Sequence, residues 1–183
     1  MTTPLADASG VVAVSGNPRP GSRTLVLARA VADELCGRLG LPGPATALDL
    51  APIAHELFAD PAPEADRYRG VLAGAAVAVV ATPVYKASYT GLLKAFLDRY
   101  PSGGLRGVLA VPVVVSASPA HSFVAEHLLR PLLVELGASV PARPLAVTES
   151  QLVESAAVVS AWADDAAPVL GRLLPARLAE VAR

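Results

Sequence analysis

Apolar and polar positions along the chain follow two alternating patterns. Five short runs are rich in Val, Ala and Leu and end in polar, Gly-rich or Pro-rich segments, as expected for strands buried on both faces of a sheet. Between them, apolar residues recur every three or four positions, a spacing typical of amphipathic helices. The predicted strands are residues 11–15, 45–50, 76–82, 108–116 and 139–147. The predicted helices are residues 24–39, 66–73, 90–100, 122–136 and about 155–182.

Strands that alternate with helices predict an α/β fold, in which helices cover both faces of a doubly wound parallel sheet. A chain of 183 residues is long enough for a single substantial core, and we expect one domain over residues 1–183. In such a sheet, ligands bind beyond the carboxyl ends of the strands, where the strand order reverses. Candidate chemistry is therefore expected in the loops that follow strands 11–15, 76–82 and 108–116.

Composition and charge exclude several classes of partner. Hydrophobic residues make up 53% of the chain, but the longest apolar runs, such as residues 71–81, are far shorter than the roughly 18 residues of a membrane span. The 15 basic and 16 acidic side chains nearly cancel and form no basic stripe, so we expect neither nucleic acid nor a membrane as a partner. The N-terminal segment lacks the basic and apolar pattern of a signal peptide, and we expect a cytoplasmic protein.

Side-chain patterns typical of direct catalysis are absent from the sequence. Cys36 is the single cysteine, which excludes an intrachain disulfide and a Cys-rich metal site. The chain also lacks clustered carboxylates in a loop, a Ser-His-Asp signature and metal-ligand spacing. We therefore assign no catalytic side chain and no metal, in agreement with chemistry that an organic cofactor carries.

The segment VVAVSGNPRPGSRT, residues 11–24, has the strand–loop–helix pattern of an anion site. Backbone N–H groups and the positive end of the helix macrodipole converge at such a loop. The segment lacks the ending of a triphosphate P-loop and the Gly pattern of a dinucleotide turn, so a mononucleotide is favoured, and FMN is the commonest one in this geometry. An ordinary polar loop before a capped helix remains the alternative. The side chains that would contact a phosphate here are Ser15, Asn17, Arg19, Ser22, Arg23 and Thr24.

The loop TPVYKASYTG, residues 82–91, is the second candidate binding segment. Pro83 and its small neighbours can present backbone amides to the edge of a planar ring, and Tyr85 offers an aromatic face. Lys86 adds a positive charge that would stabilise a reduced, anionic flavin or a dinucleotide phosphate. A lysine that is simply solvated in the loop is the alternative.

Three segments make the chain resemble the NAD(P)H-dependent FMN reductase family: SGNPRPGSRT, ATPVYKASYTGLLKAFLD and AHSFVAEHLLRPLLVELGA. Within that family, the middle segment is most similar to the flavin reductases of two-component alkanesulfonate and methanesulfonate monooxygenases. The resemblance implies a flavodoxin-like three-layer sandwich, with a five-stranded parallel sheet of order 2-1-3-4-5. It also implies FMN as the flavin, NADPH or NADH as the hydride donor and a flavin-dependent monooxygenase as the partner.

The resemblance also implies roles for individual residues. The first segment would hold the FMN phosphate through Asn17, Arg19, Ser22 and Thr24. The second would line the flavin ring, and the loop after residues 108–116 would approach it through Ser116 and Ser118, where relatives usually have a pair of glycines. The ring-lining residues are Pro83, Val84, Tyr85 and Lys86.

A proline interrupts the helix predicted at residues 122–136. Pro131 has no N–H to donate to the carbonyl of His127, so a kink or a π-bulge is expected near His127. The resemblance places a π-helix of this kind at a subunit interface, which implies a homodimer or tetramer.

Three other functions fit the same residues. The protein could keep FMN bound and reduce quinones, azo dyes or chromate. It could be a flavodoxin-like electron carrier without a substrate of its own, although aromatic residues make up only 4% of the chain. A flavin-free interaction module is the third alternative, and the absence of the glycine pair favours it.

Overall fold

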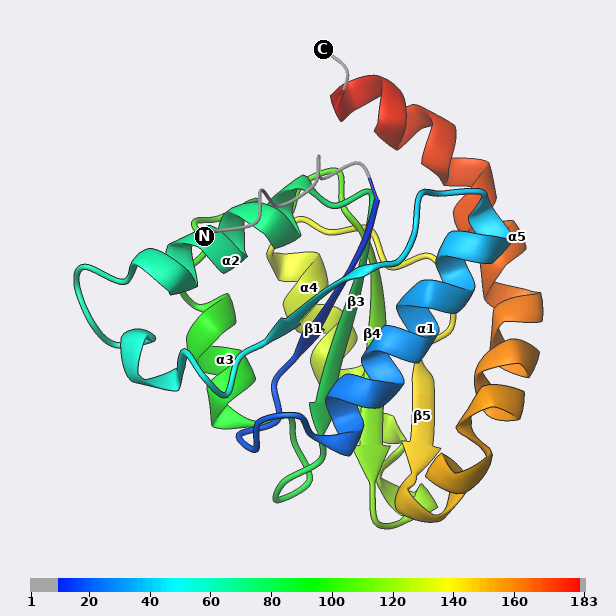
Figure 1. Ribbon diagram of the computed structural model, residues 1–183, viewed down its shortest axis with the longest axis horizontal. Coiled ribbons are helices and arrows are strands. Elements are labelled where there is room, and N and C mark those ends of the chain that lie inside the picture. Colours follow the sequence, from blue (N-terminus) through cyan, green and yellow to red (C-terminus); the bar gives the residue numbers. More distant parts are fainter. Residues whose placement is uncertain (1–9, 182–183) are drawn as a thin grey trace.

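A computed structural model describes residues 10–181 of the chain. Residues 1–9 and 182–183, with the N-terminal segment on which the expectation about a signal peptide rests, lie outside the described residues. Five strands form one parallel sheet in the order β2-β1-β3-β4-β5, as predicted (Figure 1). These strands are β1 (Val11–Ser15), β2 (Thr46–Asp49), β3 (Val77–Pro83), β4 (Leu109–Ser116) and β5 (Leu145–Thr148).

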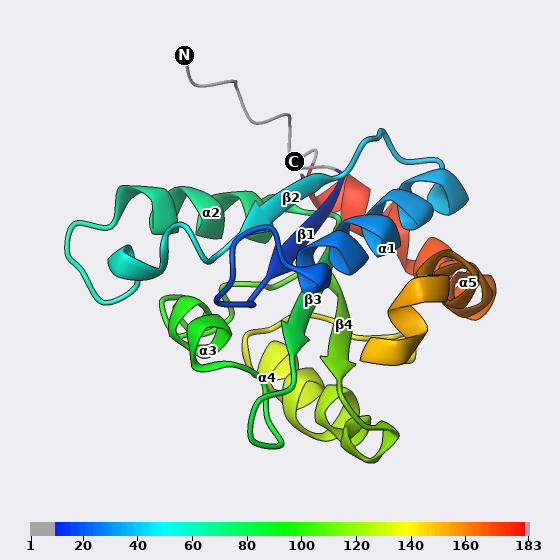
Figure 2. The ribbon, with the colours of Figure 1, turned by 60° about the horizontal axis from the view of Figure 1, so that its bottom comes forward.

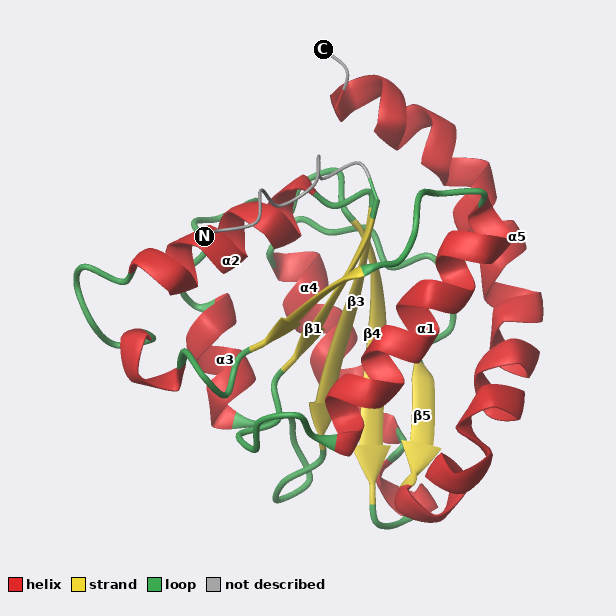
Figure 3. Ribbon diagram, viewed as in Figure 1, coloured by secondary structure: helices red, strands yellow, loops and turns green. Residues whose placement is uncertain are grey.

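Helices cover both faces of the sheet and complete the predicted three-layer sandwich (Figure 3). One face packs against α1 (Arg23–Leu39) and α5 (Ser155–Val181). The other packs against α2 (Pro63–Gly74), α3 (Gly91–Leu97) and α4 (Arg130–Glu135). The fold class is therefore the flavodoxin-like class expected from the sequence.

The three central strands are buried at every position, which explains their continuous apolar runs. Successive side chains of a strand point to opposite faces of the sheet. Thus Val12 and Val14 of β1 join the core under α2 and α3, whereas Val11 and Ala13 join the core under α1 and α5. Each apolar run therefore contributes side chains to the hydrophobic cores on both faces of the sheet.

The last strand is much shorter than predicted. The sequence predicts a strand over residues 139–147, but β5 begins at Leu145 and only a single bridge joins Ser139 to Leu109. Pro141 and Pro144 lie between these points and have no N–H to donate to a neighbouring strand. The prediction was wrong here because two prolines within four residues leave too few N–H groups for a continuous ladder, whereas β4 contains the single Pro112.

The helix predicted at residues 122–136 is divided into segments. A 3-10 turn (Pro119–His121) precedes a π-helix (Ala125–Leu129), which continues into α4. The Arg130 N–H bonds to the carbonyl of Ala125, five residues earlier, as a π-helix requires. The π-bulge expected near His127 is therefore confirmed. The remaining predicted elements begin and end within three residues of the observed bounds.

Like the turn at Pro119–His121, two other short 3-10 segments were not predicted. The first (Ala54–Glu56) lies in the Pro-rich connection between β2 and α2. The second (Glu149–Glu154) directly follows β5 and leads into α5. Its N-cap, Thr148, and Gln151 form a reciprocal capping box. The capping box fixes the position of this turn at the carboxyl edge of the sheet.

Candidate functional site

The carboxyl edge of the sheet gathers the loops that follow β1, β3 and β4, and Figure 2 brings this edge forward. A pocket of about 320 Å³ lies at this edge. Of the predicted site residues, it collects Asn17, Arg19, Ser22, Arg23, Thr24, Pro83 and Tyr85. Its other lining residues are Pro20, Gly21, Val115 and Glu149.

The loop after β1 is shaped by its own side chains. The Asn17 side chain accepts the Arg19 N–H at 3.0 Å and donates from Nδ2 to Thr24 Oγ1 at 3.1 Å. Gly21 has a φ of +62°, a conformation that glycine adopts without strain. Its N–H donates to Asp49 Oδ2 of the neighbouring strand β2 at 2.9 Å. These bonds hold the loop in one shape against the sheet.

Helix α1 begins at this loop with donors that have no partner. Ser22 is its N-cap and accepts the Leu25 N–H at 3.2 Å. Within residues 10–181, the backbone N–H groups of Arg23 and Thr24 make no hydrogen bond. Free N–H groups at the positive end of a 17-residue helix are typical of a phosphate-binding site.

Two arginines and two carboxylates surround these donors. Arg19 is exposed and forms no ion pair with a described residue. Arg23 Nη2 lies 3.1 Å from Glu149 Oε2, and both side chains remain more than half exposed. Sequence reasoning missed Glu149 and Asp49. A signal was available, because Asp49 ends one strand and Glu149 directly follows another, and the carboxyl ends of parallel strands meet at one edge.

The loop after β3 contains a tight turn in a strained conformation. Tyr85 and Ser88 exchange two backbone hydrogen bonds of 2.9 and 3.1 Å. The residues between them, Lys86 and Ala87, have φ angles of 52° and 59°. Such a turn normally contains Asn or Gly, because a left-handed conformation costs other residues about 1–2 kcal/mol each. The turn presents Tyr85 to the pocket with 44% of its surface exposed.

The other two predicted residues of this loop do not line the pocket. Val84 is half-buried, and its N–H donates to the carbonyl of Val115 at 2.8 Å. Lys86 is exposed at the tip of the turn, one residue beyond Tyr85. The structure therefore brings Pro83 and Tyr85 to the pocket wall and Lys86 to its vicinity.

Thr90 joins the first two loops below the pocket. Its hydroxyl donates to the carbonyl of Gly16 at 2.5 Å and accepts the Leu93 N–H at 3.1 Å as the N-cap of α3. Its own N–H donates to Thr82 Oγ1 at 3.2 Å. All these groups are buried, and a Cβ on Gly16 would lie 2.5 Å from the Cβ of Leu93. The base of the two loops is a closely packed, fully bonded unit.

The other three predicted serines do not line this pocket. Ser15 is buried at the end of β1, and its Oγ accepts the Asn17 N–H at 3.4 Å. The Ser116 hydroxyl donates to the carbonyl of Ser118 at 2.8 Å, and Ser116 lines a neighbouring cavity of about 430 Å³. Ser118 caps the 3-10 turn by accepting the Ala120 N–H at 3.3 Å. Ala117, which replaces a glycine of the family pattern, is exposed and does not line the phosphate-type pocket.

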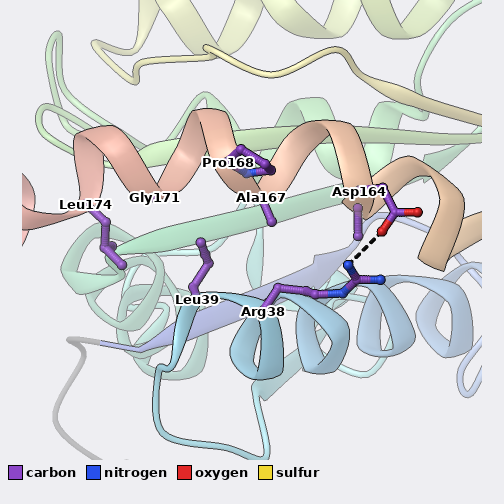
Figure 4. Close-up of a pocket in the computed structure, with 8 residues that line it drawn as sticks. Arg38, Leu39, Asp164, Ala167, Pro168, Gly171 and Leu174 are labelled. Carbon is purple, nitrogen blue, oxygen red and sulfur yellow. Dashed lines mark hydrogen bonds and ion pairs between the residues drawn. The ribbon is translucent and has the colours of Figure 1, made fainter.

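A larger cavity of about 570 Å³ lies between α1 and α5 (Figure 4). Arg38 and Asp164 form an ion pair of 2.6 Å at its wall, and the remaining lining is mainly small and apolar. Arg38 is in the last turn of α1, which runs back from the carboxyl edge of the sheet. This cavity therefore lies at the opposite end from the predicted site, and none of the predicted site residues lines it.

Two further properties concern only the part of the chain that the structure describes. In residues 10–181, no group of three or more His, Cys, Asp and Glu side chains is arranged to hold a metal ion. Over the same residues, no helix combines the length and the apolar character needed to cross a bilayer.

The sheet order and the helices on both faces define a flavodoxin-like protein, and solved structures agree. A flavodoxin, WrbA-like protein from Agrobacterium tumefaciens has the same fold, with a TM-score of 0.59 and 17% identity over 90% of this chain and 97% of that chain. A family model of NADPH-dependent FMN reductases matches residues 10–151. The chain belongs to this family, as the resemblance of its motifs predicted.

Individual relatives are similar over different lengths. NADH-dependent FMN reductase SfnE of Pseudomonas putida is 35% identical over 157 residues, which are 82% of this chain and 80% of that protein. FMN reductase (NADPH) of Escherichia coli (strain K12) is 36% identical over 76 residues, 42% of this chain and only 40% of that protein. The crystal structure of NADH:FMN oxidoreductase (EMOB) in its apo form has a TM-score of 0.72 and 29% identity, with 93% and 89% of the two chains covered.

Proposed function

We propose that this protein is an NAD(P)H-dependent FMN reductase whose flavin site is the pocket at the carboxyl edge of the sheet. The observation that carries the proposal is the start of α1, where two arginines and the residues with free backbone N–H groups line the same pocket. Family membership supports the reaction type. The relatives differ in the donor that their names give, NADPH in E. coli and NADH in P. putida, so either nicotinamide is a candidate.

The residues present fit FMN. Its phosphate needs several hydrogen-bond donors and positive charge, and the pocket has both in Ser22, Thr24, Arg19 and the helix N-terminus. Its ring needs a flat neighbour, which Pro83 and Tyr85 supply at the same pocket wall. Bound FMN supplies a flavin that accepts a hydride from the nicotinamide.

The protein's own residues position and shield the reactants in this proposal. Tyr85 packs beside the flavin ring and the entering nicotinamide. Lys86 places a positive charge at the pocket edge, where it stabilises negative charge on the flavin side of the site. The other predicted residues support the pocket wall and do not contact the flavin directly, because their polar groups are bonded to neighbouring loop atoms. These residues are Ser15, Val84, Ser116 and Ser118. No side chain is assigned a proton-transfer role.

Binding of FMN and riboflavin, followed by fluorescence quenching, tests the assignment. Arg19→Gln should weaken FMN binding by about tenfold, since a charge-assisted hydrogen bond to phosphate is lost, and should leave riboflavin binding unchanged. Arg29→Gln is the matched control, because Arg29 is exposed on α1 and does not line the pocket. Wild-type protein that binds no flavin and oxidises neither NADPH nor NADH with added FMN would refute the function.

We also propose that reduced FMN leaves the protein and supplies a flavin-dependent monooxygenase. The similarity to NADH-dependent FMN reductase SfnE supports this role, and so do the exposed arginines at the pocket mouth. Gel filtration after reduction should separate flavin from protein. Flavin that stays bound and passes electrons to quinones or azo dyes would favour the alternative reductase, and a stable blue semiquinone would favour an electron carrier.

We propose that the π-helix segment forms the contact between subunits of a homodimer or tetramer. Phe123 and Val134 are 40% and 53% exposed on either side of His127, so apolar surface flanks the π-helix. Val134→Asp should lower the mass measured by analytical ultracentrifugation. An unchanged mass would place the contact elsewhere.

A further inference from the structure

The pocket at the start of α1 contains an acidic side chain that a phosphate site does not need. Glu149 lines the same pocket as Arg19, Arg23 and the free N–H groups of α1. Its carboxylate lies 3.1 Å from the guanidinium of Arg23. A carboxylate and a phosphate compete for the same guanidinium donors, since both accept paired N–H bonds from arginine.

The fold fixes Glu149 at this position. The residue is the first of the 3-10 turn after β5, and the capping box of Thr148 and Gln151 holds that turn against the end of the strand. β5 pairs with β4 up to Ser116 and Thr148, so the turn lies at the carboxyl edge of the sheet. Glu149 therefore reaches the pocket from the opposite side to the loop after β1.

A second carboxylate engages another donor of the same loop. Asp49 Oδ2 accepts the Gly21 N–H at 2.9 Å, while Asp49 Oδ1 accepts the Ala51 N–H at 3.2 Å. Two donors at the phosphate end of the pocket are thus already bonded to acidic side chains. The Arg23–Glu149 pair joins two side chains that are each more than half exposed, so this pair is easily exchanged.

We propose that Glu149 is an affinity-setting residue, which competes with the flavin phosphate for Arg23 and thereby keeps FMN binding weak. The inference rests on the proposed function and adds a reason for flavin release. Arg23 turns to the phosphate when FMN binds, and Glu149 takes it back when FMN leaves. The protein thus treats FMN as an exchangeable substrate although its phosphate loop is pre-shaped.

Removing the competitor should tighten binding of the phosphorylated flavin only. Glu149→Gln should lower the dissociation constant of FMN by about two- to fivefold, the equilibrium factor of one exposed ion pair. Riboflavin lacks the phosphate, so its binding should not change. Glu154→Gln is the matched control, because Glu154 ends the same 3-10 segment, is exposed and does not line the pocket.

A double-mutant cycle tests whether Glu149 acts through Arg23. Arg23→Gln should weaken FMN binding. When Glu149→Gln is added to the Arg23→Gln variant, the gain in log affinity for FMN should be less than half of the gain that it gives in the wild type. Equal gains with and without Arg23 would overturn the competition. If the wild type binds FMN but Glu149→Gln has the same affinity, the inference fails while the proposed function stands. If the wild type binds neither FMN nor riboflavin, the proposed function itself fails.

Discussion

Thr90 links the loop after β1 to the loop after β3, so its hydroxyl should control both stability and flavin binding. Thr90→Val keeps the shape of the side chain and removes only the hydroxyl. The bond to the Gly16 carbonyl disappears, and this buried acceptor loses its 2.5 Å partner at a cost of about 1–3 kcal/mol. The N-cap of α3 disappears as well, at a cost of about 0.5–2 kcal/mol.

The combined loss should be about 2–4 kcal/mol, because both bonds share one oxygen atom and are not fully additive. For a chain of 183 residues, each kcal/mol lowers Tm by about 2–4 °C, so Tm should fall by about 5–15 °C. Urea unfolding should show a lower midpoint with an unchanged slope. FMN binding, measured well below Tm, should weaken because the two loops are no longer joined.

Two variants make the Thr90 experiment decisive. Thr90→Ser retains the hydroxyl and should recover most of the stability. Thr46→Val makes the same chemical change on β2, where the threonine is half-buried and its hydroxyl bonds to no described residue, and should change stability by less than about 0.5 kcal/mol. If Thr90→Val behaves like Thr46→Val, the hydroxyl does not hold the loops together.

Three further predictions concern other places in the fold. Ala87→Gly should stabilise the protein by about 0.5–1 kcal/mol, because glycine adopts the left-handed conformation at this exposed position without strain. A lower stability in urea unfolding would contradict the assigned strain. Burial raises the pKa of the Cys36 thiol, and the negative charge of Asp33 raises it further. Ellman's reagent should therefore modify this thiol at least ~tenfold more slowly in the native protein than in the unfolded protein. Equal rates would refute this prediction. Burial also raises the pKa of Tyr100 well above its ordinary value, so above pH 10 the unfolded state loses this proton and the folded state keeps it. Tyr100→Phe should lower the free energy of unfolding by about 1 kcal/mol at pH 8, because the bond to the Arg69 carbonyl is lost. Between pH 9 and 11, the wild type should lose about 1.4 kcal/mol of stability that the variant keeps. A difference in stability that is constant with pH would contradict the raised pKa.

The central strands were predictable because burial on both faces favours an almost continuous run of apolar residues. That signal is local and needs no knowledge of neighbours, which explains why β1, β3 and β4 agree with the observed bounds within one residue. Apolar content alone predicted too long a strand for β5, because it takes no account of backbone hydrogen-bond donors. Pro141 and Pro144 lack these donors, and the ladder does not extend through them. The missing N–H of Pro131 predicted a kink or a π-bulge, and the family resemblance favoured the π-helix that is observed.

The carboxyl-edge rule locates the site residues that directly follow their strands, and the loop after β1 and Tyr85 were predicted in this way. Glu149, which lines the same pocket, and Asp49, which accepts the Gly21 N–H of the loop after β1, also lie where strands end. The rule applies to both positions, although they lie at opposite ends of the sheet order. Which of these side chains contributes to the site depends on packing across the strands, which hydrophobic periodicity does not encode.

The arrangement separates the stability of the site from its affinity. The base is buried and fully bonded through Thr82, Thr90 and Gly16, so a change there must alter folding and binding together. The mouth consists of exposed charges, Arg19, Arg23 and Glu149, whose mutual interactions contribute little to folding. Mouth variants should therefore move FMN affinity over at least tenfold while Tm stays within about 2 °C of wild type. If the pocket is the flavin site proposed above, changes of charge at its mouth would tune flavin release without altering the shape of the site.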